Sequence, residues 1–419
     1  MTVSVTCKDT KGSLFVIPSK SAAHRLLISA ALADKPTKII CPAASRDIAA
    51  TARCLSALGA DIEEKDGVYN VKPINKRKQA MLDCDESGST IRFLIPVAAA
   101  LGGEVKFVGH GALPERPMGP LADTLSENGA DISYDGRLPL TVRGGLKSGR
   151  FKIAGDISSQ FISGLIFALP LLSGDSVIEI MGKTESLPYI EMTLAAVSQF
   201  GIKAGFCGNE IYIKGNQSYK SPGTLTVEGD WSNAAFWLSL GAFSDEGITV
   251  RGLVSDSIQG DRAICEILSR FGAQVECGDG FVTVRRGSLR ATEIDASYVP
   301  DLVPVLSVVA AVSEGETVIY NAGRLRIKES DRIKTTAAMI NALGGEAYET
   351  EDGLRIVGKR ELSRGRVDSA NDHRIAMSAA VAAAVSQNEV IIDGAEAVQK
   401  SYGDFFEKYK LLGAEVEKL

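Results

Sequence analysis

Six short polar segments stand directly in front of apolar stretches of the chain, and the residue types in them suit the start of a helix. Serine, aspartate and asparagine at such positions accept hydrogen bonds from the first backbone N–H groups of the helix. The segments are Ser19-Lys20-Ser21, Ser87-Gly88-Ser89-Thr90, Ser158-Ser159-Gln160, Asp230-Trp231-Ser232-Asn233, Pro300-Asp301 and Asn371-Asp372-His373-Arg374. Helix capping therefore explains one part of each segment.

Capping does not explain the cations Lys20, Arg25, Arg92 and Arg374, which fall within the first turns of these helices. A cation there faces the positive end of the helix dipole, which is unfavourable unless an anion is bound between them. Backbone N–H groups, the dipole and basic side chains together form an anion site. For Lys20 alone, a capped helix with a solvent-facing lysine is the simpler interpretation. The recurrence at several termini favours anion binding.

Two further basic segments carry candidate functional residues. "GALPERPMGP" holds Arg116 on a loop between prolines, and "RLRIKESDRI" holds six charged residues. Those six are Arg324, Arg326, Lys328, Glu329, Asp331 and Arg332. An acidic residue among cations can be held at a pKa that suits proton transfer. A solvated run of charges accounts for the same residues, and the residues alone leave both interpretations open.

The elements that must position these residues recur with a period of about 70 residues. Phrases such as "LGADIEEKDGVYNV" and "FGAQVECGDGFVTV" share a glycine, which falls at Gly59, Gly129, Gly201, Gly272, Gly344 and Gly413. The pattern predicts a helix that ends at a left-handed glycine, followed by two strands joined by a tight turn. Six copies of one unit therefore fill the chain.

Each unit contains two helices of different character. An amphipathic helix precedes the shared glycine, for example at 46–58, 261–271 and 331–343. A second helix is apolar on nearly every side, at 26–33, 93–101, 161–172, 234–243, 302–312 and 375–385. A helix without a polar face must be buried. We therefore expect an α/β protein of two similar domains with three units each, in which sheets and outer helices surround inner helices.

Composition excludes several classes of protein. The net charge of −6 over 419 residues argues against nucleic-acid binding. The longest apolar runs are shorter than the ~20 residues that span a bilayer, and the first residues lack the pattern of a signal peptide. Seven cysteines without metal-ligand spacing indicate reduced thiols rather than a disulfide framework. We expect a cytoplasmic protein with neither membrane nor nucleic-acid partners.

Nine segments together resemble the 5-enolpyruvylshikimate-3-phosphate synthase family, also named 3-phosphoshikimate 1-carboxyvinyltransferase. They are "PSKSAAHR", "SGSTIR", "ERPMGPL", "DISSQF", "PYIEMT", "PDLVPVL", "IKESDR", "NDHRIAMS" and Lys400 in "VQKSYGDFF", and they run in order between residues 17 and 406. The resemblance implies an inverted α/β barrel of two domains, each with three βαβαββ repeats, and an active site in the interdomain cleft. It also implies domains at 20–227 and at 1–19 with 228–419.

The activity that the resemblance implies is transfer of the enolpyruvyl (1-carboxyvinyl) group of phosphoenolpyruvate to the 5-hydroxyl of shikimate 3-phosphate. Phosphate is released through a tetrahedral intermediate. This transferase step belongs to the shikimate pathway to chorismate and aromatic amino acids, and the family is the target of glyphosate. The resemblance calls for no metal and no organic cofactor, and we expect a monomer.

Site residues follow from the resemblance by matched position. For shikimate 3-phosphate they are Lys20, Ser21, Arg25, Ser158, Ser159, Gln160, Ser186, Asp301 and Lys328. For phosphoenolpyruvate they are Lys20, Gly88, Arg92, Arg116, Gln160, Arg332, Arg374 and Lys400, with His373 close by. The expected catalytic residues are Asp301 as the base on the hydroxyl, with Glu329 and Lys20 for proton transfer at the methylene. The sequence leaves open which of Glu329 and Lys20 delivers the proton.

Three positions depart from the pattern of the family. Glu86 and Arg324 stand where asparagine is common, and His24 replaces another frequent asparagine. For all three we favour substitution at a surface or core edge over a functional change, although Arg324 leaves the role of its position in shikimate binding open.

Two alternatives compete with this reaction. UDP-N-acetylglucosamine 1-carboxyvinyltransferase shares the fold and phosphoenolpyruvate, but it carries a cysteine on the loop that matches Arg116, and "GHGALPERPMGP" has none. A non-catalytic anion-binding protein would need no acid–base residues beside its anion site, which argues against it because Asp301 and Glu329 are present.

Overall fold

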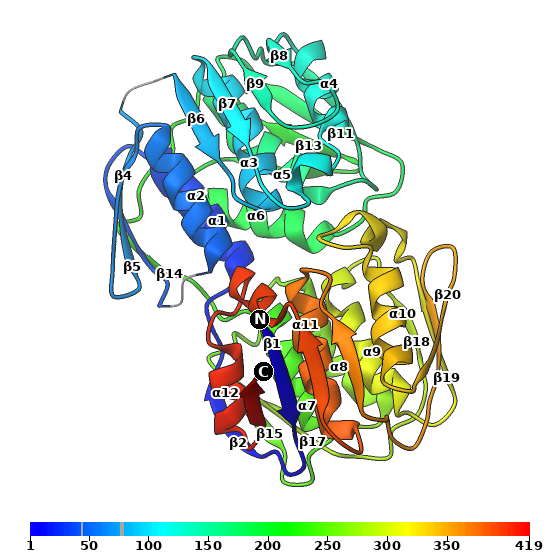
Figure 1. Cartoon of the computed structure of the whole chain (residues 1–419). Coiled ribbons are helices and arrows are strands. Elements are labelled where there is room, and N and C mark those ends of the chain that lie inside the picture. Colours follow the sequence, from blue (N-terminus) through cyan, green and yellow to red (C-terminus); the bar gives the residue numbers. More distant parts are fainter. Residues whose placement is uncertain (43–44, 76–78) are drawn as a thin grey trace. The chain divides into compact units, whose positions relative to one another are not determined.

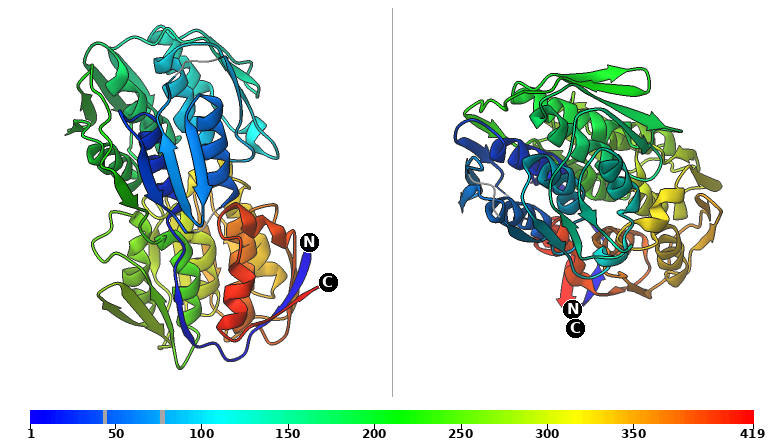
Figure 2. Two further views of the ribbon diagram at one scale, coloured as in Figure 1. Left: turned by 90° about the vertical axis from the view of Figure 1, so that its left-hand side faces the viewer. Right: turned by 90° about the horizontal axis from the view of Figure 1, so that it is seen from above.

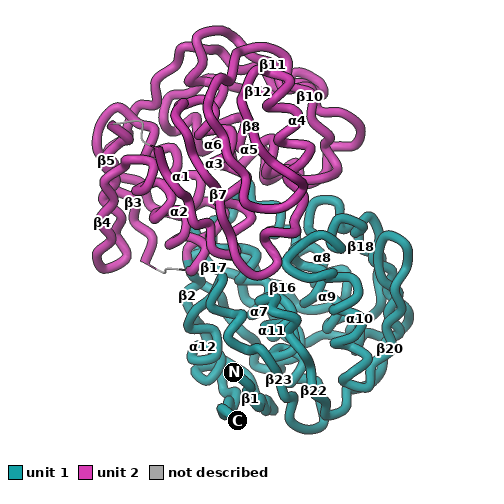
Figure 3. Tube along the Cα trace, turned by 45° about the horizontal axis from the view of Figure 1, so that its top comes forward, with its two compact units in different colours: residues 1–17, 228–419 teal, residues 18–227 magenta. Residues whose placement is uncertain are grey.

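The computed structural model describes residues 1–42, 45–75 and 79–419, and the chain divides into two compact units (Figures 1 and 3). Unit 1 consists of Met1–Ile17 and Glu228–Leu419, and unit 2 of Pro18–Val227. The expected boundary differs at one point, since Pro18 and Ser19 belong to unit 2. The reason is local, because the Ser19 side chain caps the first helix of that unit.

All six sheets formed by the described residues have four strands and the same pattern of strand pairing. The first two strands are parallel. In the order of hydrogen-bonded neighbours, the second strand pairs antiparallel with the third, and the third pairs antiparallel with the fourth. Three sheets lie in unit 1 and three in unit 2. This arrangement confirms the prediction of six related repeats in two α/β domains.

The strands of unit 2 form three sheets, and within each sheet neighbouring strands are hydrogen-bonded in the following order. They are β14 (Thr224–Thr226), β3 (Thr37–Ile40), β5 (Val68–Lys72) and β4 (Asp61–Lys65); β6 (Ala80–Asp83), β7 (Val105–Val108), β9 (Leu140–Val142) and β8 (Ile132–Ser133); and β10 (Arg150–Ala154), β11 (Ser176–Met181), β13 (Glu210–Ile213) and β12 (Ala204–Cys207).

The strands of unit 1 follow the same pattern. They are β2 (Gly12–Phe15), β15 (Ile248–Arg251), β17 (Phe281–Arg285) and β16 (Gln274–Gly278); β18 (Glu293–Asp295), β19 (Glu316–Tyr320), β21 (Leu354–Val357) and β20 (Glu346–Glu349); and β22 (Gly365–Asp368), β23 (Val390–Asp393), β1 (Thr2–Thr6) and β24 (Glu415–Lys418). Because β1 pairs with β24, the two chain ends lie beside one another (Figure 2).

Two kinds of helix complete each unit. The buried helices are α1 (Lys20–Ala31), α3 (Gly88–Leu101) and α5 (Ser159–Ala168) in unit 2, and α7 (Trp231–Gly241), α9 (Val303–Ala311) and α11 (His373–Ala382) in unit 1. The others are α2 (Arg46–Ala57), α4 (Gly119–Glu127) and α6 (Leu187–Gln199) in unit 2, and α8 (Ile264–Phe271), α10 (Arg332–Ala342) and α12 (Phe405–Leu411) in unit 1. Within unit 1, α7, α9 and α11 pack against one another.

Seven short 3-10 helices connect these elements in the part of the chain that is described. They are η1 (Leu113–Glu115), η2 (Leu169–Leu171), η3 (Gly260–Ala263), η4 (Pro300–Leu302), η5 (Gly323–Ile327), η6 (Ala383–Val385) and η7 (Ala395–Lys400).

Local signals in the sequence set the ends of the helices. Side chains of Ser19, Ser87, Ser158, Asp230 and Asp372 cap α1, α3, α5, α7 and α11 by accepting backbone hydrogen bonds. All six glycines of the repeat have a positive φ, between 73° and 110°, as predicted for left-handed residues after a helix. The buried helices thus begin at the polar segments that the sequence singled out.

Candidate active site

Lys20 is the first residue of α1, and its ammonium group does not point to open solvent. Its Nζ lies 2.9 Å from Oδ2 of Asp47, in the first turn of α2, and the two side chains are only 15% and 14% exposed. The acidic partner lets a largely buried cation stand at a helix N-terminus, where the dipole opposes it. The solvent-facing interpretation of Lys20 is therefore wrong.

Arg25, one turn further along α1, is almost fully buried and held by three hydrogen bonds. Nε donates to Oγ1 of Thr193 at 2.8 Å, Nη1 to the Ser21 carbonyl at 2.7 Å and Nη2 to the Tyr189 carbonyl at 2.8 Å. Burial lowers the pKa of Arg25 to about 10. Its other two N–H groups bond to no described residue, which leaves a donor on each Nη for a ligand.

The N-termini of α3 and α5 are joined by a chain of polar side chains. Nη1 of Arg92 donates to Oε1 of Gln160 at 2.8 Å, and Nε2 of Gln160 donates to Oγ of Ser89 at 2.8 Å. The Arg92 guanidinium also lies 5.4 Å from the centre of the Phe161 ring. Two termini that the sequence predicted as separate anion sites are thus adjacent, with fixed side chains.

Arg116 brings a second guanidinium to the start of α3. A Cβ atom built on Gly88 would lie 2.5 Å from its Nη1 and 3.0 Å from its Cζ. Only glycine at this position lets the guanidinium approach the helix N-terminus so closely.

The four predicted serines of unit 2 also lie at helix starts, and Ser21 is the second residue of α1. Ser158 caps α5 and Ser159 is its first, buried residue. Ser186 precedes α6, is buried and has a φ of +54°, an unfavourable conformation for a residue with a side chain.

In unit 1, Arg332 is the centre of a cluster of buried charges. Its Nη1 lies 2.8 Å from Asp301, its Nη2 2.6 Å from Glu329 and its Nε 2.8 Å from Asp372. The Arg332 side chain is 2% exposed. The segment "RLRIKESDRI" is therefore no solvated run of charges at this residue. Burial lowers the pKa of Arg332, but the three carboxylates outweigh it and raise that pKa above its usual range.

Asp301 is held by a second arginine as well. Nη2 of Arg374 lies 3.1 Å from Oδ2 of Asp301, and Nη1 of Arg374 donates to the Asp301 carbonyl at 3.1 Å. Burial raises the pKa of the Asp301 carboxyl, but Arg374, Lys328 and Arg332 outweigh this effect and hold the pKa below its usual range. In this state Asp301 is an ionised but weak base.

The remaining cations of unit 1 lie near the same cluster or at the start of α11. Burial, opposed in part by Asp301 and helped by Arg324 and Arg332, lowers the pKa of Lys328 to about 8. Lys400 is buried, and its Nζ donates to the Asn371 carbonyl at 2.6 Å. Within unit 1 the structure thus brings Asp301, Lys328, Glu329, Arg332 and Arg374 together.

The three residues that depart from the family pattern, His24, Glu86 and Arg324, lie in different surroundings. His24 is fully buried, with its Nδ1 2.7 Å from Oγ1 of Thr51, and burial together with Lys20 and Arg25 lowers its pKa well below the usual value. Glu86 lies against Gly111. Nη2 of Arg324 donates to the Ser297 carbonyl at 2.8 Å.

Four residues of these clusters were not predicted as site residues. Asp47 and Asp372 pair with Lys20 and Arg332, and Thr193 orients Arg25. Asp261 is buried, and burial together with Asp301 raises its pKa to about 7. In the sequence each of them resembles an ordinary helix cap, core residue or first-turn residue. Thr193 does belong to "PYIEMT", one of the segments that carry the family resemblance. Only the packing of separate segments gives them their partners.

The described residues include no group of three or more His, Cys, Asp or Glu side chains that could hold a metal ion. Among the helices in residues 1–42, 45–75 and 79–419, none has the length and apolar character to cross a membrane.

Comparison with known proteins assigns this chain to a family. Residues 6–409 match the family model of EPSP synthase (3-phosphoshikimate 1-carboxyvinyltransferase). A 3-phosphoshikimate 1-carboxyvinyltransferase of Clostridium kluyveri is 44% identical over 422 residues, covering 99% of this chain and 98% of the relative. Its counterpart from Clostridium beijerinckii is 45% identical over 418 residues, covering 96% and 95%.

A solved structure agrees with the sequence relatives. The EPSP synthase of Acinetobacter baumannii superposes with a TM-score of 0.83 at 26% identity, and the match covers 100% of both chains. The fold, the order of the motifs and the full-length relatives agree, and this chain belongs to the EPSP synthase (3-phosphoshikimate 1-carboxyvinyltransferase) family.

Proposed function

We propose that the helix-start clusters of the two units bind shikimate 3-phosphate and phosphoenolpyruvate and catalyse enolpyruvyl transfer between them. The reaction is that of the family, in which phosphoenolpyruvate gives its enolpyruvyl group to the 5-hydroxyl of shikimate 3-phosphate and phosphate is released. We further propose that the chain acts in the cytoplasm, as its sequence led us to expect.

The chemistry of the substrates supports these binding roles. Both carry carboxylate and phosphate groups, which arginine forks and helix N-termini bind well. In unit 2, Arg25 has two N–H groups without a partner among the described residues, and Arg116 is pressed against the start of α3 at Gly88. The other residues of this unit that we propose to bind the two substrates are Lys20, Ser21, Arg92, Ser158, Ser159, Gln160 and Ser186.

The observation that carries the catalytic proposal is the pairing of Asp301 with Arg332 and Arg374. Phosphoenolpyruvate brings its own anionic groups, and these compete with the carboxylates of Asp301 and Glu329 for the two guanidinium groups. When the guanidinium groups turn to the substrate, the pKa of Asp301 rises toward the range of a useful base. Substrate binding itself therefore activates the base.

The steps balance with these residues alone. The methylene carbon of phosphoenolpyruvate gains a proton while the 5-hydroxyl oxygen attacks the adjacent carbon and gives its proton to Asp301. The tetrahedral adduct then loses a proton from the new methyl group and releases phosphate. Glu329 and Lys20 are the groups proposed for proton transfer at the methylene. Lys328, Arg332, Arg374 and Lys400 stabilise the negative charge on the departing phosphate.

A turnover assay tests the proposed function directly. We expect the purified chain to release phosphate from phosphoenolpyruvate when shikimate 3-phosphate is present. Shikimate without its phosphate serves as the control, because the proposed phosphate contacts are then missing. Phosphate release with UDP-N-acetylglucosamine in place of shikimate 3-phosphate would instead support the alternative transferase, which the matched relatives do not favour.

Replacement of Gly88 by alanine should weaken phosphoenolpyruvate binding without unfolding the chain. The new methyl group would displace the Arg116 guanidinium, the far end of a flexible side chain. Loss of a charged hydrogen bond costs about 1.5–3 kcal/mol, so we expect KM for phosphoenolpyruvate to rise about tenfold or more. Gly119→Ala is the matched control, since a Cβ there meets no described atom within 4 Å. An unchanged KM in Gly88→Ala would contradict the role of Arg116.

The reaction should lose efficiency above about pH 8 because of Lys328. Its pKa is lowered to about 8, so the ammonium charge that would bind the phosphate of shikimate 3-phosphate is lost as the pH rises through that value. We expect kcat/KM for shikimate 3-phosphate to fall there. Arginine keeps its charge at high pH, so kcat/KM of Lys328→Arg should not fall in this range. If kcat/KM of Lys328→Arg fell above about pH 8 as in the wild type, the fall would belong to another group.

A further inference from the structure

Unit 1 contains a pocket at the ends of its three buried helices, and no step of the proposed reaction uses it. Its volume is about 360 Å³. The lining includes Ala242 and Val312, which directly follow α7 and α9, and Val385, the last residue of η6, which directly follows α11. Asp301 and Arg374 stand at the opposite, N-terminal ends of α9 and α11. The pocket is thus separate from the candidate active site.

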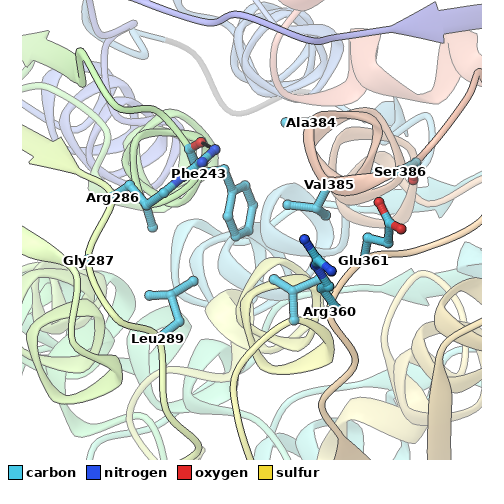
Figure 4. A pocket seen from close by; sticks show the side chains of 11 residues that line it. Phe243, Arg286, Gly287, Leu289, Arg360, Glu361, Ala384, Val385 and Ser386 are labelled. Carbon is cyan, nitrogen blue, oxygen red and sulfur yellow. Dashed lines mark hydrogen bonds between the residues drawn. The ribbon is translucent and has the colours of Figure 1, made fainter.

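One part of the lining is apolar. Phe243, Leu289, Val312 and Val385 lie around the pocket, and the side chains of Phe243 and Val385 point into it (Figure 4). A volume near the lower end of the ~300–1,000 Å³ of small-molecule sites suits a compact apolar group.

Arg360 supplies an uncommitted positive charge. Its guanidinium points into the pocket (Figure 4) and forms no hydrogen bond or ion pair with any described residue. Arg286, the other arginine of the lining, is already engaged, since it donates to the Phe243 carbonyl and lies 3.3 Å from Asp245. A guanidinium with open donors is suited to a carboxylate.

The lining of the pocket also carries negative charge, close to Arg360 (Figure 4). Three helix C-termini converge there, and each has a partial negative charge from its last carbonyl groups. Glu361 adds a carboxylate, which accepts a hydrogen bond from Nε2 of Gln387 at 2.7 Å. A simple anion would be attracted by Arg360 and repelled by these groups. A zwitterion satisfies both, with its ammonium toward Glu361 and the helix ends.

We propose that this pocket binds an α-amino acid with a large apolar side chain. Its carboxylate pairs with Arg360, its ammonium faces Glu361 and the helix C-termini, and its side chain packs on Phe243, Leu289 and Val385.

Calorimetric titration of the full chain with L-phenylalanine tests the proposal without any turnover measurement. We expect saturable binding to the wild-type chain that weakens at least about tenfold in Arg360→Gln, which loses the charged bond. Arg360 is exposed and makes no bond to a described residue, so this variant should fold normally. Glu361→Gln should also weaken binding. Arg364→Gln, exposed on the same segment but outside the pocket, is the matched control and should bind as the wild type does.

Two analogues separate the contributions of the charges. 3-Phenylpropanoate lacks the ammonium and 2-phenylethylamine lacks the carboxylate, and we expect both to bind more weakly than L-phenylalanine. Equal binding of 3-phenylpropanoate would overturn the zwitterion assignment. Absence of binding to the wild-type chain, or binding that is unchanged in Arg360→Gln, would overturn the site. None of these results depends on whether the chain catalyses enolpyruvyl transfer.

Discussion

Turnover of Asp301→Asn should fall at least about 100-fold, the usual loss when a general base is removed. Asparagine keeps the size of the side chain and its place before α9, but it cannot take the proton of the 5-hydroxyl. Shikimate 3-phosphate should still bind, because its proposed anchors in unit 2 are untouched. The measurement is kcat from phosphate release together with the dissociation constant of shikimate 3-phosphate by calorimetry.

A matched control separates chemistry from general loss of charge. Asp279 lies exposed in the turn between β16 and β17, and Asp279→Asn should keep wild-type kcat. A kcat near the wild-type value in Asp301→Asn would remove Asp301 from the chemistry and leave it a role only in holding Arg332 and Arg374.

Replacement of Arg332 by methionine should destabilise unit 1 by about 3–5 kcal/mol, the usual cost of removing one partner from a buried ion pair. Asp301, Glu329 and Asp372 would lose their shared cation, and Asp372 is fully buried. A carboxylate left buried without its cationic partner is costly, and this cost lowers the free energy of unfolding.

The tryptophans offer a signal from unit 1 alone. The chain has two, Trp231 and Trp237, and both lie buried in α7. Urea unfolding followed by tryptophan fluorescence therefore reports the free energy of unfolding of this unit. Arg326→Met is the control, because Arg326 pairs with Asp331 and Glu349 near the surface and such pairs contribute at most about 1 kcal/mol. Equal losses in the two variants would contradict the central role of Arg332.

The architecture could be predicted because its signals are local and repeated. Each helix end needs only a capping residue at one side and a glycine at the other, and the chain repeats this arrangement six times. A single copy such as the one ending at Gly59 would have been ambiguous. The sequence also separated the buried helices from the amphipathic ones, since burial on all sides requires apolar residues on all sides.

The partners within the site could not be predicted in the same way. Lys20 was expected to bind a ligand, but its pairing with Asp47 depends on how α1 and α2 pack. Glu329 pairs with Arg332 at an i,i+3 spacing, but Asp301 and Asp372 come from two distant segments, and no spacing in the sequence encodes their meeting with Arg332. For the same reason Asp301 was expected as a base, whereas the lowering of its pKa by Arg374, Lys328 and Arg332 was not expected.

The place of β1 bears on how the chain matures on the ribosome. Residues 2–6 are made long before their partners, because they pair with β23 on one side and with β24 on the other. Unit 2 is complete once residue 227 has been made, and synthesis of the rest takes roughly 10–40 seconds at ~5–20 residues per second. Throughout that interval β1 remains an unpaired strand, the kind of edge that recruits other chains. We therefore expect β1 to be the segment of the nascent chain that most needs protection by a chaperone during this interval.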